Sequence, residues 1–250
     1  VTSMSARASS EIAAILSNPT TYPVVASNTD NIQINIKDQN TSLNSSGFQT
    51  GLEDWNGNIA NKTMIDHMNT NVDPRLRILF EPGAKAAAGV YTGLDQLAAS
   101  ADQDKLIAGG TIAIYNRSTL SRNKFFPGVL INAAEVSFLK AEAYIKAGND
   151  AAAKTAYETG IRQSAEFYFG IRKLSGDNTA GTPAALTTAE VDAYIAQPAI
   201  SWAGATTNAA KWTLVAYQKW IHFNVVQSLE NWAETRRLKL VKLVLKDDVT

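Results

Sequence analysis

The most regular part of the sequence runs from residue 132 to residue 161 and reads NAAEVSFLKAEAYIKAGNDAAAKTAYETGI. Asn132, followed three residues later by Glu135, is typical of a capped helix start, and Gly148 is typical of a left-handed helix stop. A second helix is expected to begin with Asp150 as its cap. The spacing therefore predicts two antiparallel helices joined by a short turn.

The same pattern fits a tetratricopeptide-like helical hairpin over residues 131–169. Small or aromatic residues stand where the two helices of such a repeat approach each other, at Ala141, Tyr144, Ala153, Tyr157 and Gly160. In the first helix, the residues expected to face inward are Val136, Leu139, Ala143 and Tyr144. No second copy with comparable spacing occurs in the sequence, and a single repeat is too short to be stable alone. We therefore expect the partner repeats elsewhere in a longer protein.

Outside the hairpin, the sequence is again mostly helical. Helices are expected at residues 4–17 and 61–71, and at residues 191–196 behind a Thr187 cap. A long core helix is expected over residues 208–237, because apolar residues recur there at three- and four-residue spacing. These residues are Leu214, Tyr217, Ile221, Val225, Leu229 and Trp232.

Strands are scarce, and two stretches are irregular. Isoleucines alternate with polar residues over 32–36, which predicts one half-buried strand. Residues 41–57 are rich in Ser, Asn and Gly and predict a surface loop, and residues 81–128 carry many glycines without a sustained period. Long irregular regions in compact domains are often functional. The fold class is therefore mainly α: one domain over residues 1–250, built from helical hairpins with long loops and minor β.

Composition and charge exclude several classes of protein. With 45% hydrophobic residues in 250, the chain can bury a core. Lys+Arg and Asp+Glu number 23 each, so the basic excess of a nucleic-acid binder is absent and nucleic acid is not expected as a partner. There is no cysteine, which excludes disulfides and thiolate sites within these residues. No apolar run reaches the length of a membrane span, and the first residue is not expected to be the biological start.

Motifs for catalysis are not found. The two histidines, His67 and His222, are far apart and form no metal-binding pair, and neither a nucleophile elbow nor a phosphate loop occurs. Carboxylate pairs that could imitate a glycosidase dyad are Glu53 with Asp54, Glu135 with Glu142, and Glu230 with Glu234. Their positions favour structural roles, as a helix cap or as neighbours on one helix. We expect no enzyme, no metal site and no cofactor.

Aromatic residues in the irregular stretches are the candidates for ligand binding. An indole or phenol ring can stack on the apolar face of a sugar or cover a peptide side chain, while Asn and Arg bind hydroxyl groups. The candidate residues are Trp55, Asn56, Tyr91, Tyr115, Arg117 and Trp202. The alternative for each ring is that it simply anchors a long loop to the helices.

Five stretches in this order resemble the SusD/RagB family. They are DPRL at 73–76, YTG at 91–93, NAAEVSFLKAEA at 132–143, QKWI at 218–221 and ENWAETRR at 230–237. They are similar to the family's DPRL element, its following Y-x-G loop, its T-Y-A-E-V-x-F-x-x-A-E-A helix, and its closing Q-K-W-I and E-A-W-x-E-x-R-R pattern. Ala133 and residues 238–250 depart from the family pattern.

The resemblance implies a function as well as a SusD-like helical superhelix. The family is implied to be anchored by an N-terminal lipid on the outer face of the outer membrane, in a part of the family that has no counterpart in this sequence. It is implied to cover a SusC-like TonB-dependent transporter barrel and to deliver captured oligosaccharides or oligopeptides to it. Two alternatives remain: a carbohydrate-hydrolysing enzyme in a helical scaffold, and a tetratricopeptide adaptor that binds other proteins.

Overall fold

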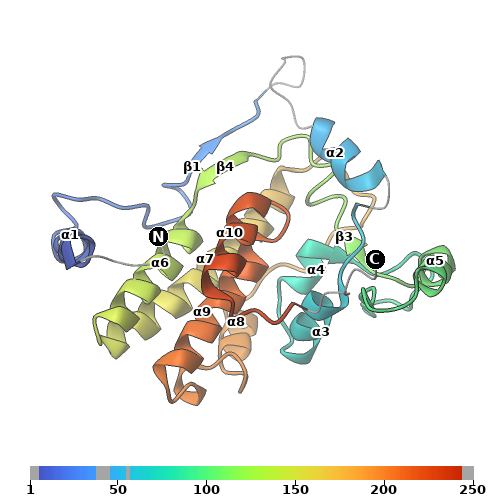
Figure 1. The fold of residues 1–250 in the computed structure, drawn as a ribbon. Coiled ribbons are helices and arrows are strands. Elements are labelled where there is room, and N and C mark those ends of the chain that lie inside the picture. Colours follow the sequence, from blue (N-terminus) through green and yellow to red (C-terminus); the bar gives the residue numbers. More distant parts are fainter. Residues whose placement is uncertain (1–5, 38–45, 55–56, 244–250) are drawn as a thin grey trace. The chain divides into compact units, whose positions relative to one another are not determined.

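The computed structural model describes residues 6–37, 46–54 and 57–243, which form helices with a few short strands (Figure 1). These residues fall into two compact units. The first unit is made of 1–33, 129–164 and 201–242, and the second of 34–128, 165–200 and 243–250. No helix among the described residues is both long enough and apolar enough to cross a membrane.

The helical hairpin predicted over residues 131–169 is present as α6 (Ala133–Lys146) and α7 (Asp150–Leu174). The Asn132 side chain accepts a hydrogen bond from the backbone N–H of Glu135 at 2.9 Å, and Gly148 has a φ of +73°. Asp150 is not the cap of α7. The Asn149 side chain takes that place and accepts from the N–H of Ala152 at 3.2 Å.

The two helices of the hairpin approach closely at Gly160. A Cβ added at Gly160 would lie 2.5 Å from Cε1 of the Phe138 ring, so only glycine fits this contact. The buried face of α6 includes Phe138, whereas the predicted inward face is less buried and its Leu139 is 46% exposed. The residues that fill the core from α6 are Ala133, Ala134, Phe138, Ala141 and Ile145.

The prediction of one long helix over 208–237 is wrong, because the chain forms two helices there. The chain forms α9 (Asn208–Phe223) and α10 (Ser228–Leu238), separate helices in Figure 1, with a break that begins at Asn224. Asn224 has a φ of 27°, outside the helical region, and its Nδ2 donates to the carbonyl of Ile221 at 3.0 Å. As a result, Trp232 is 61% exposed and is not the core residue that the periodicity predicts.

Helix α9 packs against both α6 and α10 and carries buried polar groups into the first unit. His222 is 1% exposed, with Nε2 2.8 Å from Oδ1 of Asn132 and Nδ1 3.0 Å from Oγ of Ser164. The Asn132 oxygen can only accept, so Nε2 of His222 is the donor in that bond. His222 is therefore a buried core residue with both ring nitrogens hydrogen-bonded.

Two N-terminal elements complete the first unit. Helix α1 (Ala6–Ser17) ends before Pro19 as predicted, while residues 4 and 5 of that prediction lie outside the described residues. Strand β1 (Ile32–Ile34) pairs with β4 (Gly128–Ile131). Its isoleucines are exposed, so the strand is predicted correctly but its buried face is not.

The second unit contains the remaining elements, namely α2 (Ser46–Glu53), α3 (Lys62–Thr70), α4 (Leu76–Leu79), β2 (Phe80–Glu81), α5 (Ser100–Gly109), β3 (Ile114–Tyr115) and α8 (Thr188–Ile195). Helices α3 and α8 confirm two predictions, including the Thr187 cap of α8. Helix α2 corrects the loop predicted over 41–57, and α5 and the short strands interrupt the irregular stretch 81–128. None of the residues of α5 is buried, so this helix needs no regular apolar spacing and the sequence shows none.

The DPRL motif forms a buried anchor in the second unit. Arg75 and Asp73 are almost fully buried and bond through Nε and NH2 of the arginine at 2.9 and 2.6 Å. The same NH2 donates to the Tyr194 hydroxyl on α8 at 3.1 Å. A buried pair of this kind needs every such bond to offset the cost of removing two charges from water. The motif therefore fixes α4 to α8.

Candidate functional site

A polar turn in the second unit, residues 116–123, carries the clearest candidate site. We call it the arginine loop; its sequence is NRSTLSRN, and all its residues are buried except the two arginines. Oδ1 of Asn116 accepts from the N–H of Thr119 at 2.9 Å. Nδ2 of Asn123 donates to the carbonyl of Ile171 at 3.0 Å. The first bond lies within the loop and the second ties it to α7, and together they hold the backbone in place while Arg117 and Arg122 remain partly exposed.

Arg117 is held by Glu81 of β2. Its Nε and NH2 donate to the two oxygens of the Glu81 carboxylate at 3.0 and 2.8 Å, and its backbone N–H donates to the same group at 2.6 Å. The bond to Glu81 raises the pKa of Arg117. Because two guanidinium N–H groups bond to the two oxygens of one carboxylate, the guanidinium is fixed in orientation. The Arg117 side chain is still 28% exposed.

Arg122 is held in the same way by Glu53 at the end of α2. Its Nε lies 2.9 Å from Oε1 and its NH2 2.6 Å from Oε2 of Glu53, and the Ser121 hydroxyl also donates to Oε1 at 2.6 Å. The bond from Arg122 lowers the pKa of the Glu53 carboxyl. The Arg122 side chain is 30% exposed. Two fixed guanidinium groups therefore present part of their edges to solvent.

A third carboxylate, Asp177, is also bonded to the arginine loop. Burial opposes its ionisation, but hydrogen bonds from Ser118 at 2.5 Å and from the Thr179 backbone at 3.0 Å outweigh burial, and the pKa of Asp177 is lowered. A general acid for glycoside hydrolysis needs a raised pKa instead. Neither Glu53 nor Asp177 is prepared for that role.

Two predicted ligand-binding residues, Arg117 and Tyr115, contact β2, and a third, Tyr91, lies near β3. Arg117 bonds Glu81, and the Tyr115 ring packs on Phe80 with ring centroids 4.7 Å apart. Burial raises the pKa of the Tyr115 hydroxyl. Burial also raises the pKa of the Tyr91 hydroxyl, although the charge of Arg77 opposes the rise. Tyr91 is half-buried, and the carbonyl of the next residue, Thr92, accepts from the N–H of Ala113, directly before β3, at 2.8 Å. Part of the Tyr91 side chain therefore remains exposed near the start of β3.

Of the other predicted residues, only Trp202 is among the described ones. Trp202 belongs to the first unit and is 4% exposed; its ring packs on Tyr157 and its Nε1 donates to Asp150 at 3.1 Å. It anchors the short 3-10 turn Trp202–Gly204 rather than offering a stacking surface. Trp55 and Asn56 lie outside the described residues.

Sequence reasoning missed Glu81 and Arg122 as members of the site, and it judged Glu53 only as a possible acid. The available signal was the pair of arginines, five residues apart in a stretch without an acidic residue. Buried or fixed arginines need carboxylate partners. Those partners therefore had to come from distant parts of the chain, and spacing alone could not identify them.

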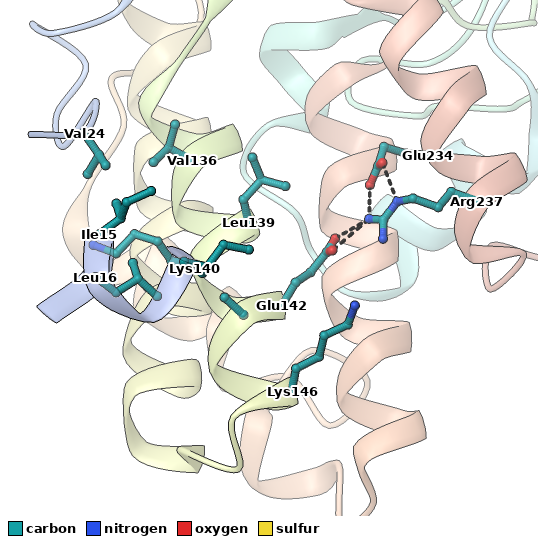
Figure 2. Close-up of a pocket in the computed structure, with 12 residues that line it drawn as sticks. Ile15, Leu16, Val24, Val136, Leu139, Lys140, Glu142, Lys146, Glu234 and Arg237 are labelled. Atoms are coloured by element: carbon teal, nitrogen blue, oxygen red, sulfur yellow. Dashed lines mark hydrogen bonds and ion pairs between the residues drawn. The ribbon is translucent and has the colours of Figure 1, made fainter. Parts of the chain in front are cut away.

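The first unit contains a different feature, an apolar groove between α1 and α6 with a volume of about 370 Å³ (Figure 2). Its apolar lining comes from both helices, with Ile12, Ile15, Leu16, Val136, Leu139 and Ala143. Lys140 and Lys146 lie along it, and Glu142, Glu234 and Arg237 close one end (Figure 2).

At that end, the motifs at 132–143, 218–221 and 230–237 are joined by a network of four charged side chains. Lys219 on α9 is 2% exposed and donates to Glu142 at 2.8 Å and also to Glu234. Arg237 donates through NH2 to Glu142 at 2.7 Å and through Nε to Glu234 at 2.7 Å. Burial opposes ionisation of Glu234, but bonds from Arg237 and the charge of Lys219 outweigh it and lower its pKa to about 2. The network joins α6, α9 and α10.

Among the described residues, no group of three or more His, Asp or Glu side chains is arranged to hold a metal ion. No curated protein matches the sequence.

Solved structures with the same fold have low sequence identity to this chain. A SusD homologue from Bacteroides fragilis has 22% identity and a TM-score of 0.76 over 96% of this chain and 51% of its own. A putative outer-membrane protein from Bacteroides vulgatus, described as probably involved in nutrient binding, has 21% identity and a TM-score of 0.76 over 97% and 52%. A chitin-binding SusD homologue from Flavobacterium johnsoniae has 24% identity and a TM-score of 0.60 over 96% and 48%. The chain spans about half the length of these relatives.

The family comparison covers the whole chain. Residues 1–250 match the SusD-like family described as starch-binding and associating with the outer membrane. The mainly helical fold with minor β agrees with that match. The chain therefore belongs to the SusD-like family.

Proposed function

We propose that this chain is part of a non-enzymatic protein that captures an oligosaccharide, or alternatively an oligopeptide, at the cell surface. The family description and the chitin-binding relative support a glycan ligand. The observation that carries the proposal for this chain is the arginine loop, where two carboxylate-bound guanidinium groups are fixed and partly exposed.

The arginine loop suits recognition of hydroxyl groups. Each sugar hydroxyl can accept from an arginine N–H and donate to a carboxylate oxygen. Because Glu81 and Glu53 already fix the two arginines, binding would cost little side-chain entropy. The exposed part of the Tyr91 ring adds an apolar surface for the C–H face of a sugar. The predicted Trp55 and Asn56 follow Glu53 closely in sequence and remain proposed members of the site.

The state of the acids supports binding rather than hydrolysis. Glu53 and Asp177 have lowered pKa values, and both accept hydrogen bonds that use their oxygens. Hydrolysis of a glycosidic bond would require one carboxyl group to be protonated near neutral pH. The proposal therefore assigns no catalytic residue.

A binding measurement tests the site. Isothermal titration calorimetry with maltoheptaose and with chitohexaose should give a Kd for at least one of them, and Arg117→Ala or Tyr91→Ala should weaken it about tenfold, the loss of one good contact. Arg7→Ala, which removes an exposed arginine of α1, serves as the matched control and should leave the Kd unchanged. Equal affinity in all variants would contradict the site, and new reducing ends during incubation would contradict the non-enzymatic assignment.

The place of this protein in uptake is the second part of the proposal. We infer a lipid-anchored location on the outer face of the outer membrane and delivery of the ligand to a SusC-like TonB-dependent transporter, as the family resemblance implies. Affinity purification of the protein from its own membranes should bring down a large membrane β-barrel. Recovery of the protein without such a partner, in a mild detergent that preserves transporter complexes, would contradict the delivery step.

A further inference from the structure

The two arginines of the arginine loop would, by residue type alone, favour an acidic ligand. Arginine is the usual residue for binding carboxylate or phosphate groups, because its planar N–H groups match a pair of oxygens. In this structure a carboxylate of the protein already holds that place. Nε and NH2 of Arg117 bond to Glu81, and Nε and NH2 of Arg122 bond to Glu53. The edge of each guanidinium that binds an acid best is therefore occupied.

Each arginine and its glutamate form a pair without net charge, and both members of each pair reach solvent. The side chain of Glu81 is 10% exposed and that of Glu53 is 16% exposed, next to the more exposed arginines. A ligand carboxylate bound to the outer edge of Arg117 would lie only one guanidinium group away from Glu81. Two like charges at that separation repel each other, and the repulsion offsets the attraction of the arginine. A hydroxyl or amide group of an uncharged sugar meets no such repulsion.

The other charged side chains near the arginine loop give a ligand no positive excess at the loop itself. Asp177 bonds to Ser118 at 2.5 Å and adds a third negative charge. Arg172 adds a positive one, but it is 7% exposed and donates to Asn178 and to the Gly181 carbonyl at 3.0 and 2.8 Å. It also lies in the last turn of α7, where the helix dipole favours a cation. The charged residues next to these in sequence are exposed to water and salt, which screen them, and they carry both signs: Asp54, Lys124 and Lys173.

We propose that Glu53 and Glu81 are specificity-determining residues, which make the arginine loop a site for uncharged oligosaccharides and exclude sugars that carry carboxylate or sulfate groups. This inference rests on the proposed function of the loop and adds the charge class of its ligand. The arginines donate to hydroxyl or amide oxygens of the sugar, while the glutamates cancel the charge that would attract an acid. A chain of uronic acids, or the C-terminal carboxylate of a peptide, is rejected for the same reason.

Ligands that differ only in charge test this selection. Calorimetry compares maltoheptaose and chitohexaose with derivatives of the same length and linkage in which the C6 hydroxyl groups are oxidised to carboxylates. The oxidised form of the sugar that binds should bind about tenfold more weakly, and binding of the uncharged form should be insensitive to salt. Equal affinity for both forms, lost for both in Arg117→Ala, would overturn this inference and leave the proposed function intact. Failure of both uncharged sugars to bind would overturn the proposed function and this inference together.

Variants that remove one negative charge identify the residues responsible. Glutamine keeps the shape of glutamate and an oxygen that accepts from the paired arginine, so Glu81→Gln and Glu53→Gln should preserve the loop. Each should shift the ratio of affinities about tenfold toward the oxidised sugar, whose binding should then weaken as salt is added. Glu53→Gln, at the more exposed glutamate, is sufficient for the test if Glu81→Gln does not fold.

Glu11→Gln is the matched control for these two variants. It removes the same charge from an exposed pair on α1, where the Glu11 side chain is 58% exposed, and it should leave the ratio of affinities unchanged. An unchanged ratio in the loop variants, or an equal shift in the control, would overturn the role of the two glutamates.

Discussion

Two groups of ion pairs in this molecule use the same chemistry for different purposes. In the first unit, Lys219 and its partners are largely buried and join three helices. In the second unit, Arg117 and Arg122 are bound as firmly to glutamates, yet each keeps more than a quarter of its side chain exposed. Burial decides the difference, because a buried charge must satisfy all its bonds within the protein whereas an exposed edge remains available to a ligand.

The largest expected effect is on the buried group. Lys219→Met should lower the free energy of unfolding by about 3–5 kcal/mol, because the buried Glu142 and the partly buried Glu234 would each lose a partner. Urea denaturation monitored by circular dichroism measures this. Lys105→Met is the control, since the Lys105 side chain is 77% exposed in its pair with Asp102. A loss below about 1 kcal/mol, the range of surface pairs, would show that the network does not hold the helices together.

The second largest expected effect is the loss, at low pH, of the stability that Glu234 gives to the buried group. The folded-state pKa of Glu234 is about 2 against an ordinary value of 4.5, so the unfolded chain binds the proton more readily. The stability that this group contributes is present above pH 4.5 and is lost as the pH falls toward 2.

Glu234→Gln isolates that contribution. Wild type and variant should differ most in unfolding free energy near neutral pH and converge between pH 4.5 and 2, as thermal unfolding at each pH would show. A difference that stays constant over this range would mean that Glu234 does not titrate in the way its contacts require.

In the exposed group, a substitution should change ligand affinity more than it changes stability. Arg122→Ala should lower stability by no more than about 1 kcal/mol, because the pair with Glu53 is partly solvated. If the arginine loop binds a glycan, the same variant should weaken binding about tenfold, the cost of one charge-assisted bond. Denaturation and calorimetry on one protein preparation compare the two quantities. A large stability loss without any loss of affinity would remove the distinction drawn between the groups.

The smallest expected effect is at an exposed ion pair, which serves as the reference for the two groups. Arg7 pairs with Glu11 on α1 with its side chain 87% exposed. Arg7→Ala should change neither the midpoint of thermal unfolding nor ligand affinity by a measurable amount, because an exposed pair one helical turn apart is screened by water and salt. A clear loss of stability would mean that exposure is a poor guide to the role of an ion pair in this protein.

Local signals in the sequence were sufficient for much of the fold. The Asn132 and Thr187 caps and the Gly148 stop depend on neighbouring backbone groups, and the structure confirms all three. The break between α9 and α10 was not visible, because asparagine at 224 is compatible with a helix and the apolar spacing continues past it. The unusual backbone there is held by the bond from Asn224 to the Ile221 carbonyl and by a bond from Asn231 of α10 to the Asn224 carbonyl at 3.0 Å.

The candidate site could be predicted only in part, for a related reason. Residue type and setting pointed to Tyr91, Tyr115 and Arg117, of which Tyr115 and Arg117 contact β2, and their role in ligand binding stays a prediction. Their partner Glu81 lies 36 residues from Arg117 in sequence. Trp202 was misjudged because a tryptophan in a loop has the same sequence signal whether its ring is exposed or buried. Long-range pairing and burial are properties of the folded chain.

The contact between Gly160 and the Phe138 ring links remote parts of the first unit. The width of the hairpin is set there by a ring lying on bare backbone, with no room for a single methyl group. Phe138 and Glu142 are on the same helix, four residues apart, so any widening of the hairpin would also shift a carboxylate that Lys219 and Arg237 hold in place. The missing Cβ at Gly160 therefore helps to keep Glu142 within ion-pair distance of Lys219 and Arg237.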